Sequence, residues 1–423
     1  MLDPKFIREN PDKVKQNILE RNFDPKLANV DAWLEIDAKR VDLQKNIEKI
    51  SQRRNEIAEL LKDVSKRSPE IIEEGKSLKE KTEPLQKEFE DIEKEWFDMI
   101  AQIPNMHFDD VPRGKDDSQN KVVREVGQKP SFTFEPKDHL QLGTDLDILD
   151  FKSGAKVTGS QFYYLKNEAV MLDLALQKFG MDFFRKKGFD LVITPDLAKS
   201  RFYLGTGYAP RGDEAQTYTI EGEDLGLIAT AEVTMAGYFA DELLPKSELP
   251  KKYAALSHCY RKEGGAYGKY SKGLYRVHQF TKLEMFVYCT EDQSQEIHKE
   301  LLAIEEEIAQ ALKIPYRVLE MCTGDLGAMA ARKYDLESWI PSKNDYGEIT
   351  STSNCTDFQA RNLNIRYKDD DGQTKFVHML NGTAVVLSRF PIAIMENYQQ
   401  EDGSIKIPEV LVPYTGFDTI PAK

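Results

Sequence analysis

Charged and aromatic residues gather in two segments, 253–263 and 274–290, on either side of a glycine-rich loop at 264–273. We expect two strands of a long antiparallel hairpin, the second beginning near Leu274. Because side chains alternate between the faces of a strand, one face of the second strand carries Arg276, His278, Phe280, Lys282 and Glu284. A solvated outer face is the alternative, but guanidinium, carboxylate and aromatic groups on one surface suit an aromatic anion better.

Three further polar segments accompany this hairpin. They are Thr230-Ala231-Glu232, Glu348-Ile349-Thr350-Ser351, and a run from Asn381 and Thr383 to Arg389. By pattern alone, Thr230 is equally well explained as the N-cap of a helix that starts near Glu232. We interpret His278 as a structural member of the strand, without a role as a base.

Taken in order, these segments resemble the signatures of the seryl-tRNA synthetase family, class II aminoacyl-tRNA synthetases. Tyr260-Arg-Lys-Glu-Gly-Gly, Arg276-Val-His-Gln-Phe280 and Lys282-Leu-Glu284 are similar to motif 2 in its seryl version. The segment ending in Pro195 is similar to motif 1, the dimer-forming element. Two departures stand out: no glycine occurs in the run 384–388 before Arg389, and residues 261–265 read Arg-Lys-Glu-Gly-Gly.

The resemblance implies the substrates ATP and L-serine, with Mg²⁺ and without zinc. It places Arg261 on the α-phosphate, Glu263 at the adenine, Phe280 against the purine ring and Arg389 on the γ-phosphate. The full ATP set is Arg261, Glu263, Arg276, Val277, Phe280, Glu348, Ile349, Thr350, Ser351 and Arg389, with Glu348 and Ser351 also holding Mg²⁺ through ATP.

The implied serine pocket contains Thr230, Ala231, Glu232, Arg261, Glu284, Asn381 and Thr383. Glu284 pairs with the ammonium group in this interpretation, and Thr230, Glu232 and Thr383 line the hydroxyl side. Such a pocket rejects alanine, because its own polar groups would be left unpaired. The implied catalytic residues are Arg261, Glu284 and Arg389.

Apolar residues spaced three and four apart from Trp33 to Val64, and again from Ile71 to Ile103, predict two helices of roughly 30 residues. A break at 65–69 predicts an antiparallel coiled-coil hairpin, with Arg54 near Thr82 and Arg40 stacked on Trp96. Pro84 should kink the second helix.

A dimerisation spacer is the plain interpretation of such an arm. The resemblance implies instead that it binds tRNA(Ser), through Arg53, Lys62, Lys66 and Arg67 of the first helix and the tip. The second helix is acidic and should face away from the RNA.

The order of these regions predicts an α+β fold: a helical arm at 1–104, a polar linker at 105–135 and an antiparallel-sheet catalytic domain at 136–423. The net charge of 58 − 72 = −14 excludes a non-specific nucleic-acid coat. Four scattered cysteines and the absence of a long apolar run favour a cytoplasmic protein with free thiols and no membrane span. The resemblance implies that it is a homodimer.

Serine activation and its transfer to tRNA(Ser), and also to tRNA(Sec) where that tRNA exists, is the function that these residues and the resemblance favour. Two alternatives remain open at this point. One is a synthetase-like protein that charges a carrier other than tRNA, and the other is an RNA-binding scaffold with an inactive catalytic domain.

Overall fold

The computed structural model describes residues 1–207, 217–263 and 272–423. Most of the glycine-rich loop, at 264–271, therefore lies outside the described residues. The chain forms two compact units, Met1–Met106 and His107–Lys423. Within the described ranges, no helix is long and apolar enough to span a membrane.

The first unit is helical throughout. Its helices are α1 (Pro4–Glu9), α2 (Pro11–Glu20), α3 (Val30–Leu60) and α4 (Pro69–Ile100). Asp3 and Asn29 cap α1 and α3 through their side-chain oxygens, and Ser68 caps α4. The helix α4 runs unbroken through Pro84.

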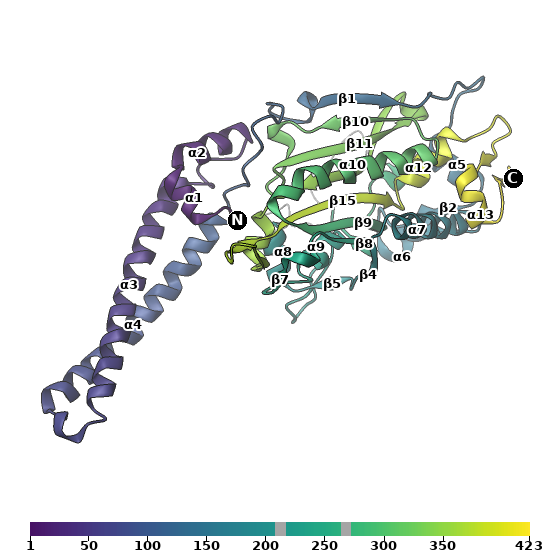
Figure 1. The fold of residues 1–423 in the computed structure, drawn as a ribbon. Coiled ribbons are helices and arrows are strands. Elements are labelled where there is room, and N and C mark those ends of the chain that lie inside the picture. The colour runs from purple at the N-terminus through teal and green to yellow at the C-terminus, as the bar shows by residue number, and fades with distance from the viewer. Residues whose placement is uncertain (208–216, 264–271) are drawn as a thin grey trace. The chain divides into compact units, whose positions relative to one another are not determined.

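The pairing of α3 with α4 is antiparallel, as the heptad pattern predicts (Figure 1). Arg54 Nη1 donates to Thr82 Oγ1 at 3.4 Å, and the guanidinium of Arg40 lies 4.8 Å from the centre of the Trp96 ring. Both predicted contacts are therefore confirmed. The cation–π contact contributes about 0.5–1 kcal/mol where it is solvated.

A buried carboxylate joins α1, α3 and α4. Asp37 accepts hydrogen bonds from Arg8 Nε at 2.6 Å, Arg8 Nη2 at 3.2 Å and Trp96 Nε1 at 2.8 Å. Burial alone would raise the pKa of Asp37, but Arg8 and Trp96 bind the ionised form and hold the pKa below its usual value. Trp33, fully buried, packs on Trp96 at 5.8 Å between ring centres.

The second unit is built on an eight-stranded sheet (Figure 1). Its order is β1 (Lys121–Val126), β10 (Tyr316–Glu320), β11 (Arg332–Ile340), β12 (Asp345–Asn354), β15 (His378–Val386), β9 (Gln279–Cys289), β8 (Lys251–Tyr260) and β4 (Asp190–Ile193). All neighbours are antiparallel except β4 and β8, which are parallel. The predicted α+β class with an antiparallel sheet is confirmed.

Helices and small sheets surround this core. The helices are α5 (His139–Asp145), α6 (Phe151–Thr158), α7 (Glu168–Lys186), α8 (Ser200–Thr206), α9 (Ala231–Ala236), α10 (Ser294–Ala311), α11 (Phe358–Leu363), α12 (Phe390–Asn397) and α13 (Val412–Thr415). The minor strands are β2 (Leu149–Asp150) with β3 (Tyr164–Leu165), β5 (Leu197–Ala198) with β6 (Gly226–Leu227), β7 (Leu243–Pro245) with β13 (Arg366–Lys368) and β14 (Thr374–Phe376), and β16 (Ile405–Lys406) with β17 (Thr419–Ile420).

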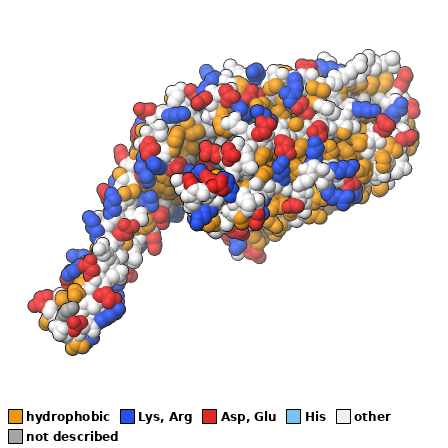
Figure 2. All heavy atoms as spheres, viewed as in Figure 1, with side chains coloured by type: hydrophobic (Ala, Val, Ile, Leu, Met, Phe, Trp, Pro, Cys, Tyr) orange, Lys and Arg blue, Asp and Glu red, His pale blue; other side chains and the backbone are white. Residues whose placement is uncertain are grey.

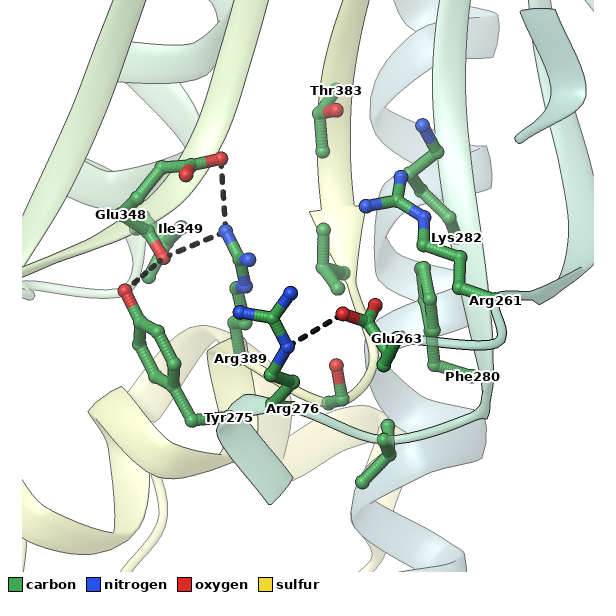
Figure 3. Close-up of a pocket in the computed structure, with 13 residues that line it drawn as sticks. Arg261, Glu263, Tyr275, Arg276, Phe280, Lys282, Glu348, Ile349, Thr383 and Arg389 are labelled. Atoms are coloured by element: carbon green, nitrogen blue, oxygen red, sulfur yellow. Dashed lines mark hydrogen bonds and ion pairs between the residues drawn. The ribbon is translucent and has the colours of Figure 1, made fainter. Parts of the chain in front are cut away.

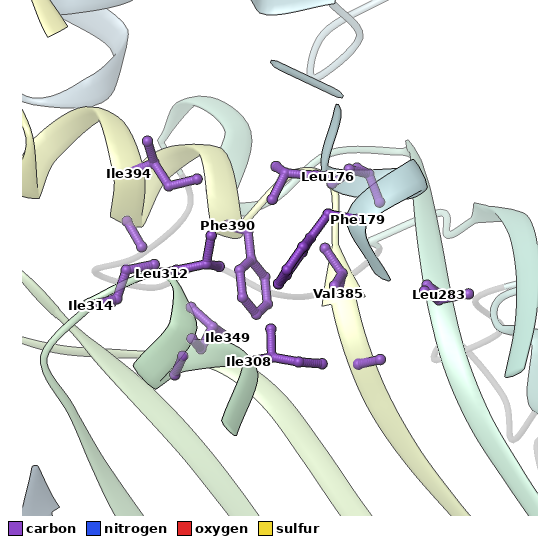
Figure 4. Close-up of a cluster of buried hydrophobic side chains, with 14 of the residues drawn as sticks. Leu176, Phe179, Leu283, Ile308, Leu312, Ile314, Ile349, Val385, Phe390 and Ile394 are labelled. Atoms are coloured by element: carbon purple, nitrogen blue, oxygen red, sulfur yellow. The ribbon is translucent and has the colours of Figure 1, made fainter. Parts of the chain in front are cut away.

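One face of the large sheet packs on helices and forms the main core. Phe390 of α12 and Phe179 of α7 meet Ile308 of α10 over Val385 and Leu283 of the sheet (Figure 4). Burying each of these side chains stabilises the fold by about 1.5–3 kcal/mol. On the opposite face, Tyr253, Phe286, Tyr288 and Met379 form a second apolar cluster with α9 and α11. Polar groups line the rest of that face of β8, β9, β12 and β15.

The sequence-based division of the chain differs from the structure between the arm and the sheet. The compact boundary falls after Met106, and residues 121–126 of the expected linker pair with β10 as the edge strand β1. The polar composition of this region suggested a linker. In the structure every residue of β1 from Lys121 to Glu125 is exposed, so no buried side chain marks the strand in the sequence. A solvated edge strand lacks the apolar alternation that reveals a half-buried strand.

We expect Asp37→Asn to destabilise the first unit by about 1–3 kcal/mol, because the Arg8 charge and the Trp96 donor lose their ionised partner. Since the pKa of Asp37 is lowered by folding, this contribution is present above about pH 3.9 and is lost as the pH falls through the folded value. Hydrogen–deuterium exchange of peptides from residues 1–106 measures it on the full chain. Asp42→Asn, at an exposed position of α3, is the control. Equal exchange in both variants would contradict the assigned role.

Candidate active site

Two adjoining cavities open on the polar face of the sheet. The first, of about 170 Å³, is lined by Arg261, Glu263, Tyr275, Arg276, Val277, Phe280, Lys282, Glu348, Ile349, Thr383, Val386, Ser388 and Arg389. The second, of about 460 Å³, is lined in part by Glu232, Glu284, Ser351, Asn381 and Cys355. Arg261, Lys282, Glu348, Thr383 and Arg389 line both, so that a ligand in one meets a ligand in the other at these residues.

The first cavity contains arginines paired with carboxylates (Figure 3). Arg276 Nε lies 2.6 Å from Glu263 Oε2, and Arg389 Nη1 lies 2.8 Å from Glu348 Oε1. Burial would lower the pKa of Arg389, but Glu348 raises it above its usual value. Conversely, burial would raise the pKa of Glu348, but Arg389 and Lys333 hold it below the usual range. Both members of this pair are therefore ionised.

An aromatic wall and a strained turn complete this cavity. Phe280 forms the wall, and the guanidinium carbon of Arg261 lies 5.3 Å from its ring centre. Glu263 has φ of +50°, a left-handed conformation that costs a non-glycine residue of order 1–3 kcal/mol. The ion pair with Arg276 fixes the carboxylate of Glu263 in the cavity.

The second cavity has a small polar end. Glu284 Oε2 accepts from Thr230 Oγ1 at 2.5 Å and from the backbone N–H of Glu232 at 3.2 Å. Glu232 Oε1 accepts from the amides of Asn381 at 2.8 Å and Gln359 at 2.7 Å. These contacts hold two carboxylates in fixed positions at a site suited to a small ligand with an amine and a hydroxyl group.

Thr230 is both an N-cap and a member of this network. Its side chain caps α9 by accepting from the N–H of Glu232 at 3.3 Å, so the capping interpretation is confirmed. Thr230 and Ala231 are fully buried, and neither lines one of the two cavities. The Thr230 hydroxyl instead holds Glu284 and the backbone of Glu232 in place.

A bulge in β12 brings Glu348 and Ser351 to the same face. The pairing with β11 skips Ile349, because Leu336 is opposite Thr350 while Glu337 is opposite Glu348. Residues three apart would otherwise face opposite sides of a strand. Thr350 therefore points to the rear, where its hydroxyl donates to Glu305 Oε2 at 2.8 Å. The inclusion of Thr350 among residues that line a nucleotide cavity is not supported by this geometry.

The second strand of the hairpin begins later than expected. Gly273–Tyr275 is a 3-10 turn, and β9 starts at Gln279. Arg276 and His278 therefore precede the strand, and His278 Nδ1 lies 2.8 Å from the carbonyl oxygen of Arg261. The predicted alternation holds within β9, because Phe280, Lys282 and Glu284 line the cavities. The core contains Leu283, Met285, Val287 and Cys289.

Two residues of the site received no role from sequence reasoning. The strand period placed Lys282 on the correct face but assigned it no role, and in the structure Lys282 lines both cavities. Gln359 lies 127 positions from Glu232, the carboxylate that it supports, and no local pattern signals this contact. In the part of the chain that the structure describes, no three His, Cys, Asp or Glu side chains are grouped as a metal site requires.

Comparisons with known proteins agree with this architecture. Residues 1–107 match the seryl-tRNA synthetase N-terminal domain, and residues 217–398 match the tRNA synthetase class II core domain (G, H, P, S and T). Serine–tRNA ligase of Treponema denticola is 54% identical over 99% of this chain and 100% of its own length. The ligase of Dictyoglomus turgidum is 52% identical over the full length of both chains.

Solved structures give the same result. Seryl-tRNA synthetase from Pyrococcus horikoshii, complexed with ATP, superimposes over all of both chains with a TM-score of 0.91 and 40% identity. Cytoplasmic serine–tRNA ligase from Naegleria fowleri, in complex with AMP, has a TM-score of 0.85 and 33% identity, over 100% of this chain and 99% of that one.

The antiparallel sheet with its arginine- and carboxylate-lined face is the core of a class II aminoacyl-tRNA synthetase. An N-terminal helical hairpin of this kind is found in one branch of that class. The chain belongs to the serine–tRNA ligase family.

Behind the site, a buried histidine of α10 supports β12. His298, 2% exposed, has Nε2 3.2 Å from the carbonyl oxygen of Thr352. Burial lowers the pKa of His298 to about 4. The neutral ring therefore donates to the backbone of the strand that carries Ser351 and Glu348.

Folding lowers the pKa of His298 from about 6.5 to about 4, so protonation of this residue favours the unfolded chain. The folded protein is therefore most stable, as far as His298 is concerned, above about pH 6.5, and it loses stability as the pH falls toward 4. The loss amounts to about 3 kcal/mol at most. We expect His298→Gln to flatten the decline of the thermal unfolding midpoint between pH 6.5 and 4.5. The exposed His258 provides the control variant His258→Gln, which should retain the decline. Parallel pH profiles for wild type and His298→Gln would exclude this account.

Proposed function

We propose that the chain activates L-serine with ATP to seryl-adenylate and transfers the seryl group to tRNA(Ser). The single observation that carries this proposal is the junction of the two cavities at Arg261. An α-phosphate in the first cavity and a carboxylate in the second would meet at this guanidinium. It would stabilise the charge that grows as the carboxylate attacks phosphorus.

ATP fits the first cavity in chemistry. Phe280 offers a face for the purine, Glu263 accepts from its amino group, and Val277 and Ile349 line the walls. Arg276 and Arg389 would bind the outer phosphates. Since both arginines already pair with carboxylates, nucleotide binding exchanges one anionic partner for another and avoids leaving buried charges unpaired.

Glu348 and Ser351 are the residues that would hold Mg²⁺ together with the phosphates. Both face the second cavity and offer hard oxygen ligands, which Mg²⁺ prefers. When bound, the ion would neutralise charge on the nucleotide. The proposal includes no zinc.

Serine fits the polar end of the second cavity. Glu284 and Glu232 offer carboxylates to the ammonium and hydroxyl groups, and Thr383 and Asn381 lie beside them. A site of buried acceptors rejects alanine, because the missing hydroxyl leaves a group unpaired. No base is required, since positioning and charge stabilisation suffice for adenylation.

ATP–pyrophosphate exchange across the amino acids tests this function. We expect exchange that depends on serine, together with charging of tRNA(Ser). Exchange without charging of any tRNA would favour a carrier other than tRNA, and no exchange with any amino acid would favour a scaffold. Charging of tRNA(Sec), where that tRNA exists, and a cytoplasmic location are further parts of the proposal.

Arg261→Ala and Arg389→Ala should affect exchange differently. Arg261 acts where charge develops, so we expect kcat to fall about 10²–10³-fold. Arg389 binds a phosphate already present in the ground state, so we expect KM for ATP to rise about 10–100-fold. Arg185→Ala, at an exposed position of α7, is the control. An identical change in KM alone for both variants would contradict these roles.

The proposed dimer uses α7 and β4, which carry exposed apolar side chains. Ile193 is 75% exposed and Leu174 52%, and β4 is an edge strand of the large sheet among the described residues. Exposed apolar side chains beside an unpaired edge favour association. The homodimer is therefore proposed to form in the second unit, independently of the arm.

The arm is proposed to bind tRNA. Lysines, arginines and acidic residues are interspersed along the α3–α4 pair in the view of Figure 2. Lys62 and Arg67 are exposed near the tip, where a phosphate can reach them. Arg53 donates to Glu74 at 2.7 and 2.9 Å, so an RNA phosphate must displace that carboxylate. The side chain of Lys66 lies outside the described residues, and its role rests on the sequence.

We expect Lys62→Ala with Arg67→Ala to lower tRNA charging. The slope of log K for tRNA binding against log salt concentration should fall in magnitude by about 1–2, because a phosphate contact that is removed no longer releases counterions. Serine-dependent exchange should be unchanged. Lys79→Ala with Lys87→Ala, exposed on α4, is the matched control.

Deletion of residues 32–103 should abolish charging and spare both exchange and the mass of the dimer in solution. If the arm were a dimerisation spacer, the deletion would instead give monomers without exchange activity.

A further inference from the structure

A buried lysine lies where the two cavities meet. Lys282, in β9, is 5% exposed and lines both cavities. In Figure 3 its side chain extends beside Arg261 on the side of Thr383. No step proposed above uses its charge. Burying an ammonium group is costly unless it is paired, so its partners define what it does.

Both partners of Lys282 belong to the proposed amino-acid pocket. Its Nζ lies 2.7 Å from Thr230 Oγ1 and 3.0 Å from Glu284 Oε2. Because Thr230 donates to the same Glu284 oxygen, the three side chains form a closed triangle. The contacts that the structure gives the Glu284 carboxylate all fall on Oε2. Within the described residues, Oε1 is thus the oxygen available to a ligand.

The charges around this triangle balance. Glu232 of α9 and Glu284 of β9 are negative, while Lys282 and Arg261 are positive. The same cavity is also lined by two further carboxylates, Asp325 and Glu348, and two further cations, Lys333 and Arg389, which balance each other. Burial raises the pKa of the Cys259 thiol of β8, which keeps it neutral. With Lys282 the amino-acid pocket is neutral as a whole, as suits a zwitterionic amino acid. Without Lys282 two carboxylates would share one cation.

We propose that Lys282 is a positioning residue that neutralises Glu284 and holds its Oε2, so that the ionised carboxylate presents Oε1 to the ammonium or hydroxyl group of the amino acid. This inference rests on the proposed function and deepens it. It gives β9 two coupled residues: one that contacts the substrate and one that keeps the first ionised and oriented.

The nearly isosteric variant Lys282→Met tests this role by serine-dependent exchange from pH 6 to 9. We expect KM for serine to rise about 10–100-fold at pH 7. KM for ATP should change little. The rise should shrink toward pH 9, because a carboxyl group that has lost its cation keeps its proton to higher pH. Lys282→Arg, which retains the charge, should restore the pH profile of the wild type.

Lys282→Gln provides a second variant in case the methionine variant fails to fold, since it retains a donor to Thr230 and loses the charge. It should show the same pH-dependent rise in KM for serine. Lys252→Met is the matched control, because Lys252 also pairs with a carboxylate, Glu300, at 2.7 Å in this sheet.

Three results would overturn the inference: a rise in KM for ATP alone, a loss of thermal stability with unchanged KM for serine, or a rise in KM for serine that does not depend on pH. Absence of serine-dependent exchange in the wild type would overturn the proposed function instead.

Discussion

Every side chain of the central strands must face either the helix side, under α7, α10 and α12, or the opposite side, which holds the cavities and a second apolar cluster, because successive residues of a strand point to opposite sides. The helix side accepts only apolar or fully bonded groups, and Leu283, Met285 and Val385 fill it. The residues between them are thereby fixed on the cavity side. The bulges of β12 and β15 change this alternation at two places. They bring Glu348 to the same face as Ser351, and Thr383 to the same face as Val386.

A polar face inside a protein must balance its charges. The sheet does so in pairs: Arg276 with Glu263, Arg389 with Glu348, and Lys282 with Glu284. Each pair brings together a cation and a carboxylate that would be costly to bury alone. The same pairing prepares the site for ligands, since a phosphate can replace the carboxylate beside Arg276 or Arg389, and an ammonium group can bind Glu284 while Lys282 stays on its Oε2.

The helical arm obeys a different constraint, because two helices alone bury little apolar surface. Its stability therefore depends on mixed contacts. Trp96 packs on Trp33, stacks under Arg40 and donates to Asp37, so a single indole joins apolar, cationic and anionic partners. Contacts of this kind can form between two helices whose remaining surface is polar.

The sequence by itself determined the helical hairpin, down to the pairing of Arg54 with Thr82, because heptad spacing counts residues from a single turn. It also determined the cavity face of β9, because a strand period of two requires only local information. The first two predictions depend on regular periods of the sequence, whereas Arg261, Glu284 and Arg389 were located by their resemblance to the motifs of a known family.

Only the tertiary structure decided the remaining features. The rearward direction of Thr350 follows from a bulge opposite β11, and β1 forms an edge strand because β10 offers it a partner. Lys282 gained a role only when Thr230, 52 positions away, was placed beside it. Pairings between distant segments depend on how the chain folds in three dimensions, and no local period of the sequence encodes them.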